Sequence, residues 1–565
     1  MSSLLIHLQR LGVAPRYNIL RSSSRFSLPS FGSFRYPFRT TSAYPDRDYE
    51  DYYRYTSGRW LWDEDSQLHE RYKRFNVCEL KKIAAKTLGA QACVSISKLA
   101  EGGFNKVFRL AMDDGTIVIA RIPNPNAGPP FKTTASEVAT MDFARTVLGI
   151  PVPKVLSWRG ETENPVESEY ILMEEATGTQ LGEIWDEMEL HDKLKIVDDI
   201  VAIERKFLSL SFTRYGNLYF ANDAFLGCEK AQIVDEVPQS LKKDVENRFV
   251  IGPVGDRNFW LRERTSMDID RGPWKHPQDY LKAIGQREIA WIGSHATQKP
   301  LGGLFATSEA QRTPDAHVAL YRKFLDVAEY LLPKGDQIKP TLWHWDIHAP
   351  NIFVHENHIT GLIDWQDTWV GPLFLQARHP RLVDYNGELM IRLPESYDAL
   401  EDEEEKERIR IQVEKSIAQW TYENETRNTN PILHDILHMN YGRTRRDTVE
   451  FSANTWDGDI IPFRQCLIRI ARHWNEINSE IPCPIEFTDE EIQAHLRDGD
   501  GWNENADFWD SLQGFVHRDG WTSNEDYERA REMFAQLRER GLQSLSGEER
   551  LAFEESTRWA VSRPE

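Results

Sequence analysis

Residues Trp343–Asn351 read WHWDIHAPN, and Gly361–Asp367 read GLIDWQD. Asp346 and Asn351 are five residues apart, an apolar run follows Asn351, and two apolar residues lead directly into Asp364. Short apolar runs bounded by polar loop residues are typical of strands. The pattern therefore indicates a polar loop, a hairpin strand and a second, isolated carboxylate.

These residue types, in this order, suit phosphoryl transfer. That reaction needs a carboxylate to orient the acceptor hydroxyl, and oxygen ligands for Mg²⁺. Asp346 suits the first role, while Asn351 and Asp364 supply the hard oxygen donors that Mg²⁺ prefers. We interpret His344 as a hydrogen-bonding brace of the catalytic loop. The segment thus predicts Asp346 and His344 as catalytic residues and Asn351 and Asp364 as metal ligands.

A metallohydrolase is the alternative interpretation of the same loop. His344, Asp346 and His348 form an HxDxH cluster that suits metal ligands. Such a site needs further His or Asp ligands near strand ends, and the amide of Asn351 is a poor ligand for a transition metal. The phosphotransferase interpretation is therefore favoured.

Length and composition set outer limits on the class of protein. A chain of 565 residues predicts two or three structural units, and 40% hydrophobic with 28% charged residues is typical of soluble globular proteins. The net charge of -21 argues against a nucleic-acid partner. Five scattered Cys without a CxxC pair predict neither a disulfide framework nor a zinc knuckle. No apolar run is long enough for a transmembrane segment, while peripheral membrane contact stays open.

The N-terminus has a different charge from the rest. Residues 1–45 contain six Arg and nine Ser but no acidic residue, and LLIHLQRLGV (residues 4–13) would form an amphipathic helix. This pattern is typical of a mitochondrial transit peptide, so it predicts localisation to the mitochondrion. A disordered basic tail is the alternative.

The order of predicted elements indicates an α+β fold. After a linker over 46–75, residues 76–178 predict a helix begun by Asn76 and ended by Gly89, a hairpin with a DDG turn, a helix capped by Thr134, and two further strands. Residues 179–395 predict a mostly helical lobe that contains the loop Trp343–Asn351. Within this lobe, residues of about 211–308 are rich in Gly, Pro and Trp and are interpreted as an insertion. Residues 396–565 predict a helical C-terminal region.

The predicted hairpin carries candidate nucleotide-binding residues. Gly102 and Gly103 let a backbone approach a ligand closely, although such a pair is more often an ordinary turn. Arg121 follows the alternating run of the next strand, and Glu137 in the following helix is placed to pair with it. A cation held in this way binds phosphates. The alternative is a surface Arg and a solvated Glu.

At these residues the chain resembles a known family, the aminoglycoside phosphotransferase or choline kinase-like branch of the protein kinase-like fold. HWDIHAPN resembles its catalytic loop, GLIDWQD its metal motif, and YILMEEATG its hinge strand, over about residues 76–384. Within this stretch, IGPVGDRNFW and RGPWKHPQDY look like a fungal mitochondrial branch. The resemblance implies a two-lobed fold, ATP and Mg²⁺ as cofactors, and an adenine held by the backbone of Met173 and Glu174.

Two positions depart from the family pattern. Arg121 stands where the family has a strand lysine, and Trp345 stands where it has a small residue. Arginine keeps the positive charge but has a different, forked geometry. The sequence thus predicts an ATP-dependent phosphotransferase that acts on a small hydroxyl-bearing molecule in mitochondria. The alternative is a catalytically silent, nucleotide-binding scaffold.

Overall fold

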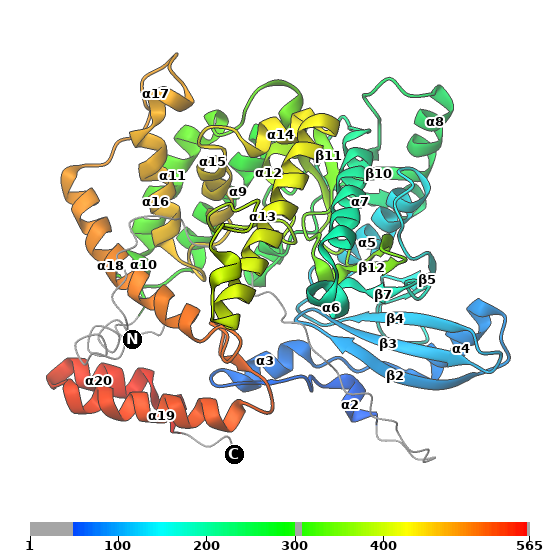
Figure 1. The fold of residues 1–565 in the computed structure, drawn as a ribbon, viewed down its shortest axis with the longest axis horizontal. Coiled ribbons are helices and arrows are strands. Elements are labelled where there is room, and N and C mark those ends of the chain that lie inside the picture. Colours follow the sequence, from blue (N-terminus) through cyan, green and yellow to red (C-terminus); the bar gives the residue numbers. More distant parts are fainter. Residues whose placement is uncertain (1–48, 300–307, 562–565) are drawn as a thin grey trace.

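A five-stranded antiparallel sheet forms the smaller of two lobes (Figure 1). The structure, a computed structural model, describes residues 49–299 and 308–561. In order across the sheet, the strands are β2 (Cys93–Glu101), β3 (Asn105–Met112), β4 (Ile117–Pro123), β6 (Tyr170–Met173) and β5 (Val155–Arg159). The predicted DDG hairpin is confirmed between β3 and β4, where Gly115 takes a φ of 85° and the Asp114 carboxylate accepts from the Thr116 backbone.

Two helices belong to this lobe. α4 (Val77–Leu88) begins and ends as predicted: the Asn76 side chain accepts from the Glu79 backbone, and Gly89 takes the left-handed conformation that suits glycine. α5 (Lys132–Thr146) begins two residues before the predicted cap Thr134. That prediction is wrong because the Thr134 hydroxyl donates to the Glu169 carboxylate at 2.7 Å instead.

The larger lobe is mostly helical and carries two short sheets. β11 (Pro340–Trp343) pairs with β14 (Trp369–Pro372), and β12 (Ile352–His355) lies between β13 (His358–Leu362) and β7 (Thr179–Gln180). The helices that surround them are α6 (Leu181–Ile184), α7 (Leu190–Leu208), α9 (Pro277–His295), α11 (Pro314–Val327), α12 (Leu373–Gln376), α13 (Glu403–Thr429), α14 (Pro431–Leu437), α15 (Gly442–Phe451) and α16 (Ile460–Arg472). Together the lobes give the predicted two-lobed α+β kinase-like fold.

The segment expected as an insertion, about 211–308, has regular structure of its own. β10 (Phe249–Gly252) lies between β8 (Asn217–Phe220) and β9 (Glu229–Lys230), and α8 (Gln239–Arg248) precedes β10. The small sheet lies against α5, where the Asn217 amide donates to the Ser136 hydroxyl at 2.8 Å. The insertion therefore contacts the helix that carries the predicted phosphate-site residue Glu137.

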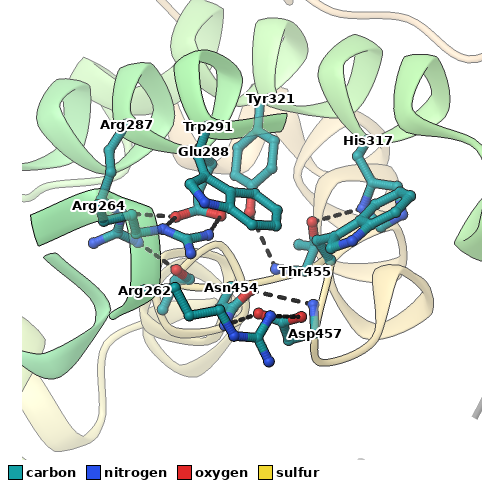
Figure 2. A network of polar contacts seen from close by, with 12 residues as sticks. Arg262, Arg264, Arg287, Glu288, Trp291, His317, Tyr321, Asn454, Thr455 and Asp457 are labelled. Carbon is teal, nitrogen blue, oxygen red and sulfur yellow. Dashed lines mark hydrogen bonds and ion pairs between the residues drawn. The ribbon is translucent and has the colours of Figure 1, made fainter. Parts of the chain in front are cut away.

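A buried ionic cluster packs the turn that contains Arg264 against α9, within the same segment (Figure 2). Arg264 and Arg287 both pair with Glu288 of α9, at 2.8 and 2.7 Å, and all three side chains are almost fully buried. Arg264 stacks on the Trp291 ring at 4.3 Å. Nearby, Arg262 pairs with Asp457 at 3.0 Å, so the cluster also reaches the loop that follows α15.

The segment predicted as a linker, 46–75, is structured where it is described. It contains α2 (Glu50–Tyr53), β1 (Arg59–Trp60) and α3 (Glu64–Arg71), and β1 pairs with β15 (Trp521–Thr522) near the C-terminus. We call residues 49–75 the N-terminal strap. Aromatic residues of the strap and of the helices α18 (Asp489–Ser511) and α19 (Tyr527–Ser544) share a small core. α20 (Gly547–Ser556) packs beside α19 (Figure 1).

The strap supports the end of β2. The backbone N–H and hydroxyl of Thr56 and the hydroxyl of Ser57 all donate to Oε1 of Glu101, at 2.6 to 2.9 Å. Lys98 pairs with the second oxygen of Glu101 at 2.9 Å. Glu101 directly precedes Gly102, so these contacts fix one side of the predicted glycine loop.

The predicted transit peptide, residues 1–45, lies outside the described residues. Within the described ranges, no helix has the length and apolar character needed to cross a bilayer.

The buried Arg264–Glu288–Arg287 cluster gives a stability prediction. Glu288→Gln leaves two buried cations without their carboxylate, and breaking a buried ion pair in this way costs about 3–5 kcal/mol of unfolding free energy. We expect a clearly lower midpoint in urea unfolding. The exposed Glu407–Arg410 pair is the control, and Glu407→Gln should leave the midpoint unchanged. Equal midpoints for the two variants would contradict a structural role for Glu288.

Candidate functional site

The predicted catalytic loop lies between two strands of the larger lobe. β11 ends at Trp343 and β12 begins at Ile352, so both ends of the loop are fixed. The Asn351 amide donates to the Asp346 backbone carbonyl at 3.1 Å and to the carboxylate Oδ2 at 3.3 Å. The structure therefore brings the predicted base and one predicted metal ligand into direct contact.

The other carboxylate oxygen of Asp346, Oδ1, lies near two side-chain nitrogens but forms no hydrogen bond with either of them. Oδ1 lies 3.4 Å from His348 Nδ1 and 3.5 Å from Arg381 Nη2. It is buried, and within the described part of the chain it has no hydrogen-bond partner. Oδ1 is thus suited to accept a hydrogen bond from a hydroxyl. Arg381 was missed by the sequence reasoning because it lies 35 residues beyond Asp346 with no motif around it.

His344 links the catalytic loop to the metal motif. Its Nε2 lies 3.1 Å from the carbonyl oxygen of Ile363, the residue before Asp364. The ring packs edge-on against Trp365, and burial lowers the pKa of His344, which favours the neutral imidazole. A neutral ring that donates to this carbonyl matches the predicted brace.

Arg121 meets its predicted partner and one that was not predicted. It is buried and forms an ion pair with Glu137 of α5, as expected from the sequence. Its Nη2 also lies 3.2 Å from Oδ1 of Asp364. Asp364 adopts a φ of 62°, and its side chain is half-exposed. One guanidinium therefore joins the small-lobe sheet, its helix and the predicted metal ligand.

Gln366 completes this junction, and the sequence reasoning did not identify it. Its Oε1 accepts from Arg121 at 2.6 Å and from the Asn105 amide at 2.7 Å, while its Nε2 donates to the Ala127 carbonyl at 2.9 Å. Its place in GLIDWQD, two residues after Asp364, was the only available signal. Gln366 ties the metal motif to the strand that follows the glycine pair.

The predicted glycine loop joins β2 to β3. The Gly102 N–H donates to the Asn105 carbonyl at 2.9 Å, and the Gly103 carbonyl lies 3.5 Å from the Asn124 amide. The guanidinium of Arg257, from the insertion, lies 4.0 Å from the ring centroid of Phe104. Arg257 has no ion-pair partner within 4 Å among the described residues. The insertion therefore places a cation, held by a ring contact rather than by an ion pair among the described residues, beside the glycine loop.

The predicted hinge residues lie at the end of β6. Met173 is buried and faces Ile119 of β4 in the sheet register. The Glu174 N–H donates to the Lys154 carbonyl at 2.9 Å, so this N–H is already engaged within the protein. A hydrogen bond from this hinge to a base would therefore use other backbone groups.

The donor set fits Mg²⁺. Asp364 presents a half-exposed carboxylate, and the Asn351 amide nitrogen points toward Asp346, which leaves its carbonyl oxygen directed elsewhere. The two residues are held at neighbouring strand ends, because the Ile363 N–H donates to the Asn351 carbonyl at 3.0 Å. Carboxylate and amide oxygens are ligands that Mg²⁺ accepts.

A family model and three kinds of known protein match this chain. The family described as "Phosphotransferase enzyme family" matches residues 95–375. A subtelomeric hrmA-associated cluster protein of Aspergillus fumigatus is 32% identical over 487 residues, which cover 79% of this chain and 92% of that protein. Altered inheritance of mitochondria protein 9 of Yarrowia lipolytica is 26% identical and covers 86% of both chains. A solved aminoglycoside phosphotransferase in complex with ADP and hygromycin B covers 69% of this chain and 95% of its own, at 12% identity and a TM-score of 0.35.

The two lobes, with the loop between β11 and β12 beside the small-lobe sheet, have the arrangement of a kinase-like fold. The chain belongs to the phosphotransferase enzyme family, and the resemblance seen in its motifs is confirmed. Its similarity extends to altered inheritance of mitochondria protein 9 from several yeasts, including Saccharomyces cerevisiae at 24% identity. These relatives are named as mitochondrial proteins, and they confirm the localisation predicted from the N-terminus.

Asp367 is a further acid in this region that the sequence reasoning did not single out. Burial raises its pKa to about 7, the nearby carboxylates of Asp256 and Asp364 act in the same direction, and Arg257 and Arg121 oppose the shift. In the unfolded chain the carboxyl pKa is near 3.8. Between pH 3.8 and about 7, Asp367 is therefore protonated in the folded protein and ionised in the unfolded chain.

This shift gives a pH prediction. The stabilising effect of the bound proton is complete below the unfolded pKa and is lost as the pH rises through about 7. Asp367→Asn should therefore raise the melting temperature relative to wild type at pH 8, and this difference should shrink toward pH 4. A difference that is constant across this range would contradict the raised pKa.

Proposed function

We propose that this protein is an ATP-dependent phosphotransferase that moves the γ-phosphoryl group to a hydroxyl of a small molecule. The observation that carries the proposal is the contact between Asp346 and Asn351, together with the His344 bond to Ile363. These bonds hold Asp346, the proposed acceptor-binding carboxylate, beside Asn351 and Asp364, the proposed metal ligands, and this arrangement suits phosphoryl transfer.

Asp346 would bind the acceptor hydroxyl through Oδ1, the buried oxygen that lacks a hydrogen-bond partner. It would orient this hydroxyl toward the phosphate and take its proton as the transfer is completed. Arg381, whose Nη2 lies 3.5 Å from the same oxygen, would help to hold the carboxylate in this position by charge attraction.

The phosphates would lie between the glycine loop and the metal motif. Arg121 and Arg257 approach this region from the small lobe and from the insertion, so the phosphates would meet two cations. Asn351 and Asp364 would hold Mg²⁺, which when bound neutralises charge on the β- and γ-phosphates. Gly102 and Gly103 would let the loop backbone approach the nucleotide, and Met173 and Glu174 would border the adenine.

A silent nucleotide-binding scaffold is the second candidate, and one observation favours it. Arg121 pairs directly with Asp364, the carboxylate that is expected to bind the metal. If this pair persists with nucleotide bound, the protein would bind ATP without productive metal geometry. The two candidates agree on nucleotide binding and differ on transfer.

Two variants of the full chain separate the candidates. With Asp364→Asn, ATP should no longer raise the melting temperature more with Mg²⁺ than without it, because a metal ligand is lost. With Asp346→Ala, Mg-ATP should still stabilise the protein, but phosphoryl transfer should fall at least about 10²-fold, the scale for loss of a positioned base. Labelled ATP and a mitochondrial metabolite extract supply the transfer measurement. Asp65→Asn, on the exposed surface of α3, is the control and should match wild type.

The enzyme proposal fails if wild type binds Mg-ATP, labels no acceptor, and behaves like Asp346→Ala in every measurement. The scaffold would then be the better description. Loss of the Mg²⁺-dependent stabilisation in Asp65→Asn as well would show that the thermal measurement does not report the site.

We also propose that residues 1–45 act as the transit peptide. Fused to a fluorescent reporter, they should carry it into mitochondria, because they are rich in Arg and lack acidic residues. Replacing their six Arg with Gln is the matched control and should leave the reporter in the cytosol. An unmodified fusion that stays cytosolic would contradict the proposal.

A further inference from the structure

Two histidines and a glutamate meet where α13 and α14 join, outside the site described above. Glu423 belongs to α13, and His434 and His438 lie one helical turn apart at α14. One potential ligand atom from each of the three lies within 4.8 Å of the other two. The cluster lies on the helical lobe, with α13 and α14 side by side (Figure 1).

His438 directs one ring nitrogen at the oxygen of Glu423 that has no hydrogen bond. His438 Nδ1 lies 2.9 Å from the His434 carbonyl oxygen, which can only accept, so this nitrogen carries a proton. The other nitrogen, Nε2, lies 3.2 Å from Glu423 Oε2. Oε2 is buried and has no hydrogen-bond partner among the described residues. In the neutral imidazole Nε2 then carries a lone pair, and a metal ion can accept this lone pair and one from Oε2.

His434 is placed to add a second imidazole. Its ring stacks on that of His438, with centroids 4.2 Å apart and planes 24° from parallel. Its Nε2 accepts from Arg427 Nε at 3.2 Å, so this nitrogen carries a lone pair. Arg427 is exposed and can leave this position when another cation takes it.

His379 holds the glutamate from the other side. Its Nε2 lies 2.5 Å from Glu423 Oε1, which leaves Oε2 to face the two histidines. Outer partners of this kind orient metal ligands and are nearly as important as the ligands themselves.

We propose that Glu423, His434 and His438 bind a divalent transition-metal ion of the zinc type, with His379 as the residue that orients Glu423. Imidazole and carboxylate ligands suit zinc and its neighbours, with donors about 2.0–2.2 Å from the ion. Two tetrahedral donors at that range lie about 3.4 Å apart, close to the 3.2 Å between His438 Nε2 and Glu423 Oε2.

Such an ion would also affect the segment that contacts the predicted catalytic loop. His379 precedes Arg381 by two residues, and Arg381 contacts Asp346. An ion that fixes Glu423 and His379 would therefore help to order the segment that carries Arg381. The binding proposal does not depend on the phosphotransferase proposal, since it rests on different residues.

Zinc titration of the chelator-treated full chain tests the site. Competition against a chromophoric zinc indicator should show one ion bound per chain, and zinc should raise the melting temperature. Glu423→Gln and His438→Ala should each weaken binding more than tenfold, and His379→Ala about 10–100-fold, the usual effect of losing an outer partner. His358→Ala is the control, because His358 pairs with Asp199 at 3.1 Å outside the cluster, and its zinc affinity should equal wild type.

Two results would overturn the proposal. One is a wild-type zinc affinity no greater than that of the His434→Ala, His438→Ala double variant. The other is an NMR titration in which His438 stays doubly protonated at pH 7 and is unaffected by one equivalent of zinc, since the second proton would then explain the contact. Circular dichroism of each variant without zinc separates lost binding from lost folding.

Discussion

The buried guanidinium of Arg121 requires counter-charges, and the residues that supply them come from both lobes. Its side chain is almost completely enclosed, and a buried cation without a partner is strongly destabilising. Glu137 supplies one carboxylate from the helix of the small lobe, and Asp364 supplies another from the metal motif of the large lobe. Gln366 adds a neutral acceptor and also reaches Asn105. The relative position of the lobes at this point thus follows from one charge.

The insertion gives the lobes a second connection besides the hinge. Asn217 bonds to the helix that carries Glu137, Arg257 packs on the glycine loop, and the Arg262–Asp457 ion pair holds the same segment to the large lobe. Any opening of the lobes has to break some of these contacts or move the insertion with the small lobe. The insertion therefore borders the glycine loop, where the proposed phosphate site lies.

Local patterns in the sequence were enough to predict the fold and the site pairs that lie in one motif or on neighbouring elements. Asp346 with Asn351 and Arg121 with Glu137 are in contact as expected, because short loops and adjacent elements leave little freedom. The start of α5 was misplaced because a tertiary bond takes Thr134 away from the cap position.

Contacts between distant parts of the chain were not predictable from one sequence. Arg257 and Arg381 reach the site from segments with no motif of their own, and only the folded chain shows which surface each one faces. Gln366 lay inside a recognised motif, yet nothing local distinguishes a glutamine that links two lobes from one exposed to solvent. The assignment of 46–75 as a linker rested on composition, which does not report the pairing of β1 with β15.

That pairing has a consequence for protein maturation. The strap holds Glu101 through Thr56 and Ser57, and it closes against the far end of the chain through β15. A processing peptidase that cut well upstream of Thr56 would leave the glycine loop intact. A cut beyond it would strip three hydrogen bonds from a buried carboxylate and detach the C-terminal helices from the small lobe. If residues 1–45 are removed after import, as proposed, the strap therefore sets a C-terminal limit on the position of the cut.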